Sequence, residues 1–376
     1  MTELAEALQA QGLQLTVWCA QPTLTEHHTR YPKRLIHHGI LIQRVWSTQF
    51  PKKNFWGKLL NHLSFGLSIL IKGLLSRDKS PILVFTNPPF LGILAAWISK
   101  LKNRKMVYVV FDLYPDTAIA CDLLSDQHWL SRLWRRANLI CYRQATHIVV
   151  LGRCMRAKLQ PQLPPELHDK LHEITVWGDD TNITPSSSSS SSSSLTLLYA
   201  GNLGRFHDVE TFAEAARALQ GHPHLHWRFV GDGYKKAWLS RFITTHALTQ
   251  VSLEPFVPRP QLRALLTSAD IGLVSLLPSQ VGLSVPSKTF GLMAAGLPMI
   301  GVLPPDCEIA HILRTYNCGL VVEPGNTDAL VEAIHTLAND PELRLTLGKN
   351  ARKALEDHYT VRQAAEKYKE LLLNGW

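Results

Sequence analysis

The chain has 376 residues, is 45% hydrophobic and carries a formal net charge of +9 at pH 7. This length exceeds one ordinary hydrophobic core and suits two domains of typical size. Its six cysteines are scattered without a Cys-x-x-Cys pair, which argues against a disulfide framework and against a zinc site and fits a reducing cytoplasm. The first residues are acidic and helical rather than a cationic and apolar leader, so we expect a cytoplasmic protein.

The excess positive charge lies in the first half of the chain. Residues 1–180 contain 22 Lys and Arg against 13 Asp and Glu, whereas residues 181–376 contain 17 of each class. A one-sided basic field attracts nucleic acid, anionic lipid or a phosphorylated acceptor. Because no nucleic-acid motif accompanies these residues, we expect no nucleic-acid partner.

Residues 59–75 predict a long apolar helix that is too often interrupted by His, Lys, Ser and Gly to span a bilayer well. One face of it carries Leu60, Leu63, Leu67, Leu70, Ile71 and Leu74. The basic residues beside this stripe are Lys52, Lys53, Lys58 and Lys72. The pattern is typical of a helix lying peripherally on an anionic membrane surface, but the stripe could equally pack on the domain's own sheet.

Strands and helices alternate throughout the chain. In the first half we expect a helix over residues 4–11 and strands over 14–18, 82–85, 106–111 and 147–151. In the second half the expected strands are 195–200, 226–230, 251–256, 271–275, 299–303 and 319–322. Nearly continuous apolar strands separated by helices predict parallel sheets covered on both faces. The predicted fold class is therefore α/β, with two doubly wound Rossmann-like domains facing each other across a cleft.

The expected domains are residues 1–180 and 195–359, joined by a Ser-rich linker over 181–194 that works as a flexible hinge. A last helix, about 360–376, is expected to pack back on the first domain. The helix over residues 4–11 is of the kind that follows an opening strand, so we expect the first domain to lack that strand. In such sheets ligands bind at the carboxyl ends of the strands, which directs attention to the cleft.

The segment Val285–Pro298 predicts a helix with a cationic start, a closing glycine and an immediate turn into a strand. Pro286 suits the approach to a first turn, Ser287 can cap it, and Lys288 stands where unpaired N–H groups already favour an anion. We expect a phosphate at this position. An ordinary capped core helix would leave the same signals.

A second phosphate-binding signal is the glycine turn after the strand over residues 195–200. Gly201 and Gly204 let the backbone approach a ligand closely, and Asp208 can cap the helix that follows. The loops at Val230–Gly233 and Phe256–Pro258 end neighbouring strands at the same edge. The Gly-x-Gly-x-x-Gly spacing of nicotinamide-dependent oxidoreductases is absent, which disfavours that class.

These segments together resemble a family 4 glycosyltransferase of the GT-B fold, close to the subgroup acting in bacterial cell-surface polysaccharide synthesis. The matching segments of the second half are Gly201–Asp208, Val230–Gly233, Phe256–Pro258, Ser268–Leu273, Val285–Pro298, Asn317–Gly319, Glu323–Gly325 and Leu347–Arg352. Those of the first half are Leu4–Val17 and Phe111–Asp116. The resemblance covers nearly the whole chain.

The resemblance implies a nucleotide-diphosphate sugar as donor substrate, with no cofactor and no metal. The donor-binding residues it implies are Gly201, Asn202, Leu203, Gly204, His207, Asp232, Val257, Gly282, Leu283, Ser284 and Ser287. The phosphates would lie on the glycine turn and at Ser287, the base near Val257, and the sugar at residues 282–284.

The chain also departs from the family pattern. The two glutamates that the wider family separates by seven residues fall on Leu283 and Gly291, and the Arg and Lys of the family's glycine turn fall on Asn202 and His207. An aromatic residue, Phe111, stands where many members have a histidine.

Glycosyl transfer needs a stabilised diphosphate leaving group and a route for the acceptor's proton. Without an Asp-x-Asp metal motif, the cations Lys288 and Arg205 are the expected stabilisers. The family retains anomeric configuration, which suggests that the departing phosphate oxygen takes the proton. Asp112 is our candidate for orienting the acceptor hydroxyl, although it could instead cap the turn over residues 112–116.

The expected function is transfer of a sugar to an acceptor hydroxyl in cell-surface polysaccharide or glycolipid synthesis. The basic first half suits a lipid-linked acceptor at an anionic membrane surface. The alternative is a non-catalytic homologue that binds a nucleotide sugar or a membrane, because the two family glutamates are absent.

Overall fold

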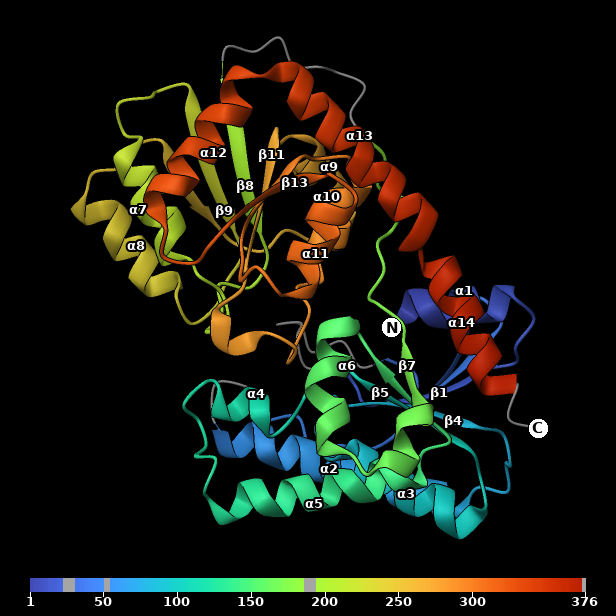
Figure 1. Cartoon of the computed structure of the whole chain (residues 1–376). Coiled ribbons are helices and arrows are strands. Elements are labelled where there is room, and N and C mark those ends of the chain that lie inside the picture. Colours follow the sequence, from blue (N-terminus) through green and yellow to red (C-terminus); the bar gives the residue numbers. More distant parts are fainter. Residues whose placement is uncertain (23–30, 51–54, 186–193, 374–376) are drawn as a thin grey trace.

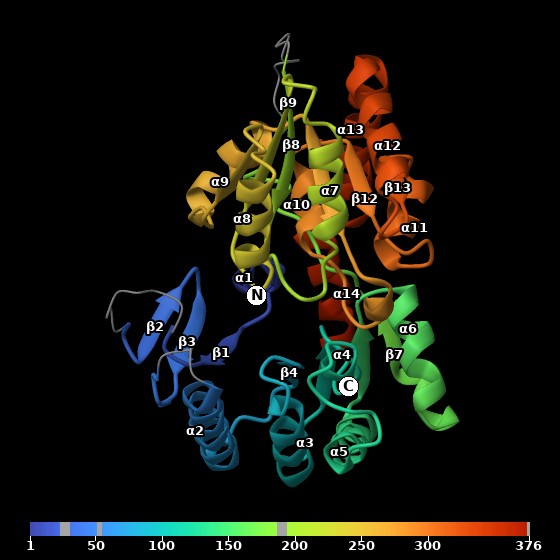
Figure 2. The ribbon, with the colours of Figure 1, turned by 90° about the vertical axis from the view of Figure 1, so that its left-hand side faces the viewer.

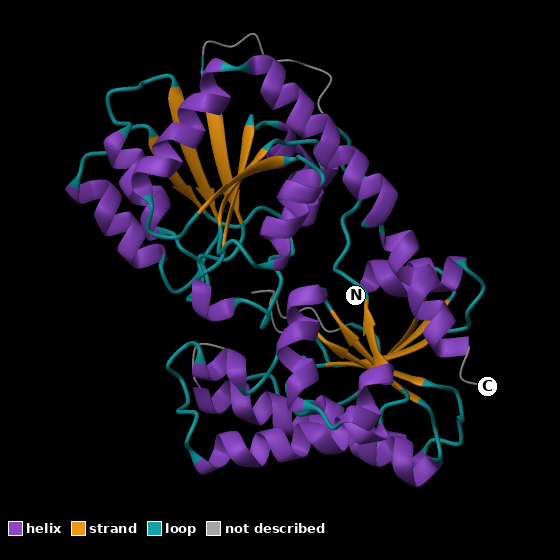
Figure 3. Cartoon of the chain, in the orientation of Figure 1, coloured by secondary structure: helices purple, strands orange, loops and turns teal. Residues whose placement is uncertain are grey.

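The computed structural model describes residues 1–22, 31–50, 55–185 and 194–373. They form two α/β lobes, shown one above the other in Figure 1. Each lobe has strands in its interior and helices outside them (Figure 3), as the hydrophobic strand sequences require. The predicted fold class of two doubly wound domains is confirmed.

The N-terminal lobe contains two separate sheets. The larger is parallel, in the order β4 (Ile82–Phe85), β5 (Met106–Val110), β6 (His147–Val150) and β7 (Leu171–Glu173). The smaller has the order β1 (Thr16–Cys19), β3 (Ile40–Arg44) and β2 (Arg34–His37), with β2 antiparallel to β3. The sequence patterns did not predict β2, β3 or β7, because β2 is largely exposed, β3 is mostly half-buried and β7 has only three residues.

The helices of the N-terminal lobe occupy both sides of the larger sheet. They are α1 (Thr2–Ala10), α2 (Phe55–Leu75), α3 (Leu91–Lys102), α4 (Asp116–Ile119), α5 (Trp129–Gln144) and α6 (Arg153–Leu159), with 3₁₀ turns at Gln160–Gln162 and Pro165–Lys170. The last helix of the chain, α14 (Val361–Leu373), packs beside α1. Leu4 and Leu8 of α1 and Tyr368 of α14 share one core with Val107 and Val109 of β5.

The C-terminal lobe has one fully parallel sheet. Its strands are β8 (Leu195–Ala200), β9 (Leu225–Val230), β10 (Val251–Glu254), β11 (Ile271–Ser275), β12 (Met299–Val302) and β13 (Gly319–Val322), in the order β10-β9-β8-β11-β12-β13. The helices are α7 (Glu210–Ala218), α8 (Lys236–Thr245), α9 (Arg259–Thr267), α10 (Lys288–Ala294), α11 (Glu308–Thr315), α12 (Thr327–Asn339) and α13 (Pro341–His358), with a 3₁₀ turn at Pro278–Gln280. The predicted strands of this half are confirmed to within two residues at each end. The strand order reverses at β8, so the loop after β8 stands at the switch point where such sheets bind ligands.

The chain enters the C-terminal lobe before the serine tract, which corrects the predicted position of the linker. Ile183 is already part of that lobe's core, and Gly178 packs against the backbone of Phe290. The guanidinium of Arg352 holds this segment in place by donating to the carbonyl oxygens of Ile183 and Asp180 at 2.7 and 2.9 Å. The serine tract over residues 186–193 lies outside the described residues.

The predicted apolar helix is α2, and the interpretation that its stripe packs on the sheet is wrong. Gly66 and Gly73 face α3, where a Cβ atom would strike side chains of that helix. The opposite face exposes Leu60, Leu63, Leu67 and Ile71 of the predicted stripe and also Trp56 and Leu75. Leu70 and Leu74 are half-buried. Among the described helices none has the length and apolar character needed to cross a membrane.

Candidate active site

A cleft of about 590 Å³ lies between the two lobes. From the N-terminal lobe it is lined by Met1, Glu3, Phe111, Asp112 and Trp177, and from the C-terminal lobe by Gly201, Asn202, Phe206, His207, Ser284, Pro286, Ser287 and Lys288, among others. Phe111 follows β5 and Gly201 follows β8, so carboxyl ends of parallel strands from both sheets face this space. The arrangement brings the glycine turn and the start of α10 to one site.

The glycine turns at the ends of β8 and β9 are packed directly on one another. Gly201 has φ of 149° and Gly231 has φ of 156°, a region that L side chains rarely adopt. A Cβ atom on Gly231 would collide with the carbonyl oxygen of Gly201. The N–H of Leu203 donates to the carbonyl of Asp232 at 2.8 Å, which ties the two loops together. The glycines therefore set the backbone path beside the cleft.

Lys288 carries a buried ammonium at this turn. Its Nζ lies 3.6 Å from the centroid of the Tyr199 ring, and a Cβ on Gly201 would be 3.5 Å from it. Within the described residues Nζ makes no hydrogen bond, and burial lowers the pKa of Lys288 well below its ordinary value. A desolvated cation without an acceptor is stabilised by an incoming anion.

The predicted role of Ser287 as helix cap is wrong. Ser287 is the residue before α10, but its side chain makes no capping hydrogen bond. Its backbone is already helical, with φ of −62° and ψ of −22°, whereas a capping residue is normally extended. The side chain is exposed on the cleft.

His207 stands beside this cation as a neutral imidazole. Its Nδ1 lies 2.8 Å from the carbonyl oxygen of Ser275, so Nδ1–H is the donor and Nε2 is free to accept. Burial, and then the charge of Lys288, lower the pKa of His207 to about 3. His207 therefore adds no positive charge to the cleft, although the family pattern has lysine at this position.

Asp112 faces the cleft from the N-terminal lobe. Its backbone N–H donates to Oγ1 of Thr86 at 3.3 Å, as does the N–H of Phe111 at 3.0 Å. Burial raises the pKa of the Asp112 carboxyl. Among the described residues no hydrogen bond of this carboxylate is seen, and α4 begins without a side-chain cap. The alternative in which Asp112 caps the following turn is therefore not realised.

Seven of the predicted site residues do not line the cleft: Leu203, Gly204, Arg205, Asp232, Val257, Gly282 and Leu283. Arg205 is exposed and its guanidinium lies 3.5 Å from the Tyr234 ring centroid. Asp232 pairs with Lys236 at 3.6 Å on the surface. The predicted roles of these residues in donor binding or catalysis therefore require a ligand that extends beyond the cleft.

Gly282 and Leu283 join the lobes instead. A Cβ on Gly282, whose φ is 72°, would lie 2.7 Å from the carbonyl oxygen of Cys154. Leu283 is 2% exposed and belongs to the core of the N-terminal lobe. A leucine in a glycine-containing loop gives no local signal of that contact, and its assignment to the sugar came from the family resemblance.

Sequence reasoning also missed Glu3. Its carboxylate accepts a hydrogen bond from the indole of Trp177 at 3.0 Å and pairs with Arg259 of α9 in the other lobe. The residues are far apart in sequence, and only the position of α1 beside the cleft brings them together.

Two family models match the chain. The model described as glycosyl transferases group 1 matches residues 181–354, and the glycosyl transferase 4-like domain matches residues 1–167. Together they cover both lobes. This chain belongs to family 4 of the glycosyltransferases. It is therefore a transferase enzyme, as predicted.

Individual relatives agree with this assignment. The probable glycosyltransferase WbjE of Pseudomonas aeruginosa is 26% identical over 306 residues, which are 78% of this chain and 74% of WbjE. Sucrose-phosphate synthase of Thermosynechococcus elongatus has a similar structure, with a TM-score of 0.72 at 16% identity over 98% of this chain and 90% of that one. HepE of Anabaena, solved in complex with UDP-glucose, has a TM-score of 0.67 at 16% identity over 90% of this chain and 87% of HepE. The structural likeness confirms the GT-B fold of this glycosyltransferase.

Proposed function

We propose that this glycosyltransferase binds a nucleoside-diphosphate sugar on the C-terminal lobe and transfers its sugar to an acceptor hydroxyl held by the N-terminal lobe. The observation that carries the proposal is the buried ammonium of Lys288 beside the Gly201 turn, without a hydrogen-bond acceptor among the described residues. A diphosphate would supply that acceptor and accept from backbone N–H groups of the same turn. HepE, a structural neighbour, was solved with UDP-glucose.

Lys288 and the backbone would then stabilise the leaving diphosphate without a metal. Transfer is proposed to retain the anomeric configuration, with the departing phosphate oxygen taking the acceptor's proton. Asp112 would orient the acceptor hydroxyl. The other carboxylates of the cleft are engaged: Glu3 with Arg259 and Trp177, and Asp179 with the side chain and N–H of Asn182.

The acceptor is proposed to be lipid-linked and presented at the surface of an anionic membrane. Helices α2, α3 and α5 lie together at the end of the N-terminal lobe that is remote from the C-terminal lobe (Figure 2). Their exposed apolar residues are Trp56, Leu60, Leu63, Leu67, Ile71 and Leu75 on α2, Trp97 and Leu101 on α3, and Trp129, Leu130, Leu133 and Ile140 on α5. These twelve exposed apolar side chains on three neighbouring helices exceed the singly scattered apolar residues of an ordinary surface.

Positive charge on the same helices favours a bilayer as the partner of this surface. The exposed basic residues are Lys58 on α2, Lys100 on α3, and Arg132, Arg136 and Arg143 on α5. On a membrane, the apolar side chains enter the headgroup boundary and the cations attract anionic lipid. Each Lys or Arg near an anionic leaflet contributes about 1 kcal/mol to binding. Lys52 and Lys53 lie outside the described residues. We propose a peripheral location on the cytoplasmic face of the membrane.

The relatives point to the pathway class. WbjE is named a probable glycosyltransferase, and WcaI of Escherichia coli, 27% identical over 168 residues, is named a putative colanic acid biosynthesis glycosyl transferase. We accordingly propose a role in cell-surface polysaccharide or glycolipid synthesis.

The test is an assay with a panel of nucleotide sugars, in which binding is measured by calorimetry and turnover by release of free nucleoside diphosphate. Turnover that depends on a lipid-linked or glycan acceptor is the expected result. Binding of one donor with no turnover on any acceptor would contradict the proposed transfer. No binding to any member of the panel would overturn the proposal.

A further inference from the structure

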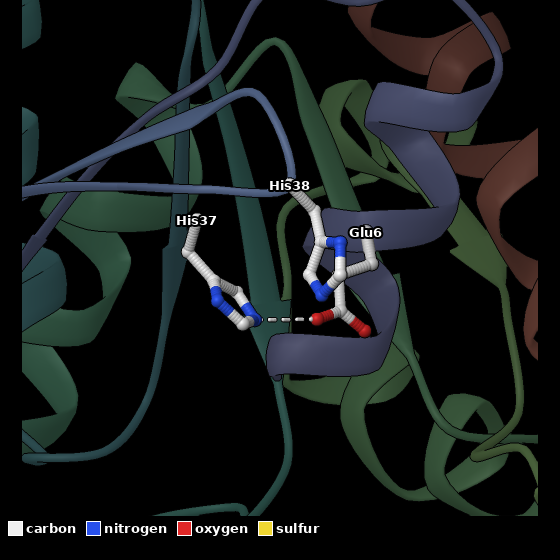
Figure 4. Close-up of side chains that lie close together, drawn as sticks. All are labelled: Glu6, His37 and His38. Carbon is white, nitrogen blue, oxygen red and sulfur yellow. Dashed lines mark hydrogen bonds and ion pairs between the residues drawn. The ribbon is translucent and has the colours of Figure 1, made fainter.

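Three potential metal ligands meet where the β2–β3 hairpin touches α1. Glu6 lies on the second turn of α1, His37 is the last residue of β2, and His38 begins the turn that follows. Figure 4 shows the His37 ring directed at the Glu6 carboxylate, with His38 beside both. Among the described residues, this is where three His, Cys, Asp or Glu side chains bring their ligand atoms within 4.8 Å of one another.

The hairpin turn fixes the position of both histidines. His37 pairs with Ile40 across the strands, so His38 and Gly39 form a two-residue turn. Their φ values are 46° and 80°, the left-handed pair of a type I′ turn. A Cβ atom on Gly39 would lie 2.6 Å from Nε2 of Gln9, so the turn rests directly on α1. The two imidazoles therefore leave one rigid turn at the surface of the helix that carries Glu6.

The ligand atoms are close to the spacing that a cation requires. Nε2 of His37 lies 2.9 Å from Oε1 of Glu6. The His37 and His38 rings are perpendicular, with centroids 4.3 Å apart. Donors around a tetrahedral zinc ion are about 3.3 Å from one another. The three ligand atoms all lie within 4.8 Å of one another, which is near this spacing.

The donor set selects the kind of metal. Two imidazoles and one carboxylate suit zinc and its transition-metal neighbours, whereas magnesium and calcium prefer sites made of oxygen. The side chains of His37 and Glu6 are 41% and 37% exposed, so a metal can enter from solvent and a water can complete its coordination. A His37–Glu6 pair alone would leave the third donor, His38, without a role.

We propose that Glu6, His37 and His38 form a zinc site that clips the β2–β3 hairpin to α1. The site lies on the helix whose first turn reaches the cleft: Glu3, one turn before Glu6, pairs with Arg259 of the other lobe. Zinc bound here stabilises the contact between the small sheet and α1 and thereby supports the helix that contributes Glu3. The site is separate from the residues proposed to bind the donor and does not depend on the function proposed for them.

The experiment uses tag-free protein that has been stripped with a chelator and titrated with zinc chloride by calorimetry and by thermal unfolding. We expect one zinc ion per chain with a dissociation constant in the micromolar range, a rise in Tm on binding and no response to magnesium. His38→Asn should weaken zinc binding by at least about 10-fold, because it removes a ligand rather than a residue that only orients one. Asparagine accepts the left-handed backbone of this turn, so the variant keeps the metal-free Tm of the wild type. Glu6→Gln should weaken zinc binding similarly.

The matched control is the histidine group on the C-terminal lobe, where His222 and His335 have ring centroids 5.1 Å apart. The double variant His222→Asn, His335→Asn should bind zinc like the wild type. Equal zinc binding by the wild type and His38→Asn would overturn the proposal, as would loss of zinc in the His222/His335 double variant alone. Absence of any zinc binding to the wild type would overturn it as well.

Discussion

The backbone N–H of Leu113, just after β5, donates a hydrogen bond of 3.0 Å to the carbonyl oxygen of Leu283 in the other lobe. The side chain of Leu283 is buried in the N-terminal core at the same place. Asp112 precedes Leu113 and Ser284 follows Leu283, and both line the cleft. The two residues that join the lobes are therefore adjacent in sequence to residues that line the two walls of the cleft.

Leu283→Ala should lower the free energy of unfolding by about 2–5 kcal/mol, because the substitution leaves a cavity in a core that belongs to the opposite lobe. The measurement is chemical denaturation. Leu345→Ala, at a position that is 48% exposed on α13, is the control and should change stability little. Equal effects of the two substitutions would show that Leu283 does not hold the lobes together.

Gly201→Ala should weaken binding of a nucleoside diphosphate at least about 10-fold, because the backbone has φ of 149° and the added methyl group would lie 3.3 Å from Cε of Lys288. Binding is measured by calorimetry. Gly221→Ala serves as the control, since a Cβ there meets nothing within 4 Å. Unchanged affinity in Gly201→Ala would remove the glycine turn from the donor site.

The depressed pKa of His207 predicts a loss of stability in acid. The unfolded chain binds a proton on this histidine below about pH 6.5, whereas the folded imidazole stays neutral until about pH 3. The effect of His207 on the free energy of unfolding is therefore absent above about pH 6.5. Near pH 5 proton uptake by the unfolded chain has lowered that free energy by about 2 kcal/mol. His207→Gln should show a smaller loss between these two pH values. A denaturation series that gives the same pH dependence for both proteins would contradict the buried, neutral state of His207.

The α2 surface predicts membrane binding that depends on its apolar stripe. Leu63→Ser combined with Leu67→Ser should reduce co-sedimentation with anionic vesicles at least about 5-fold, because both side chains are exposed and would lose their insertion into the headgroup boundary. Leu345→Ser, a substitution of an exposed leucine on the other lobe, should sediment like the wild type. Equal sedimentation of wild type and double variant, or equal binding to neutral vesicles, would argue against a membrane-bound acceptor.

The sequence predicts most of this fold because most of its buried strands can be recognised from their own residues. Met106–Val110 and Ile271–Ser275 are completely buried and consist mainly of apolar residues, so their continuous apolar runs identify them as strands. The β2–β3 hairpin lacks that signal, because Arg34–His37 is mostly exposed. The importance of its turn residues, His38 and Gly39, becomes visible only in the structure, where the turn packs on α1.

The meeting of the Gly201 turn and Lys288 at the cleft was predictable for a similar reason. The Gly201 turn and Lys288 each belong to a local motif, and the fold needs only to bring the two motifs together. The position of Leu283 and the pairing of Glu3 with Arg259 depend on how the lobes dock, which no local pattern records. The serine tract misled the prediction of the domain boundary because its composition suits a linker wherever it stands in the chain.

The most direct test of the account is the affinity of a nucleoside diphosphate for Lys288→Met, measured by calorimetry beside the wild type. Methionine keeps the length of the side chain and removes the charge, and the control is Lys353→Met, an exposed lysine paired with Asp357. We predict a loss of about 1.5–3 kcal/mol in binding free energy for Lys288→Met, about 10- to 150-fold in affinity, and none for the control. Unchanged affinity in Lys288→Met would contradict the assignment of the buried ammonium to the donor's phosphates.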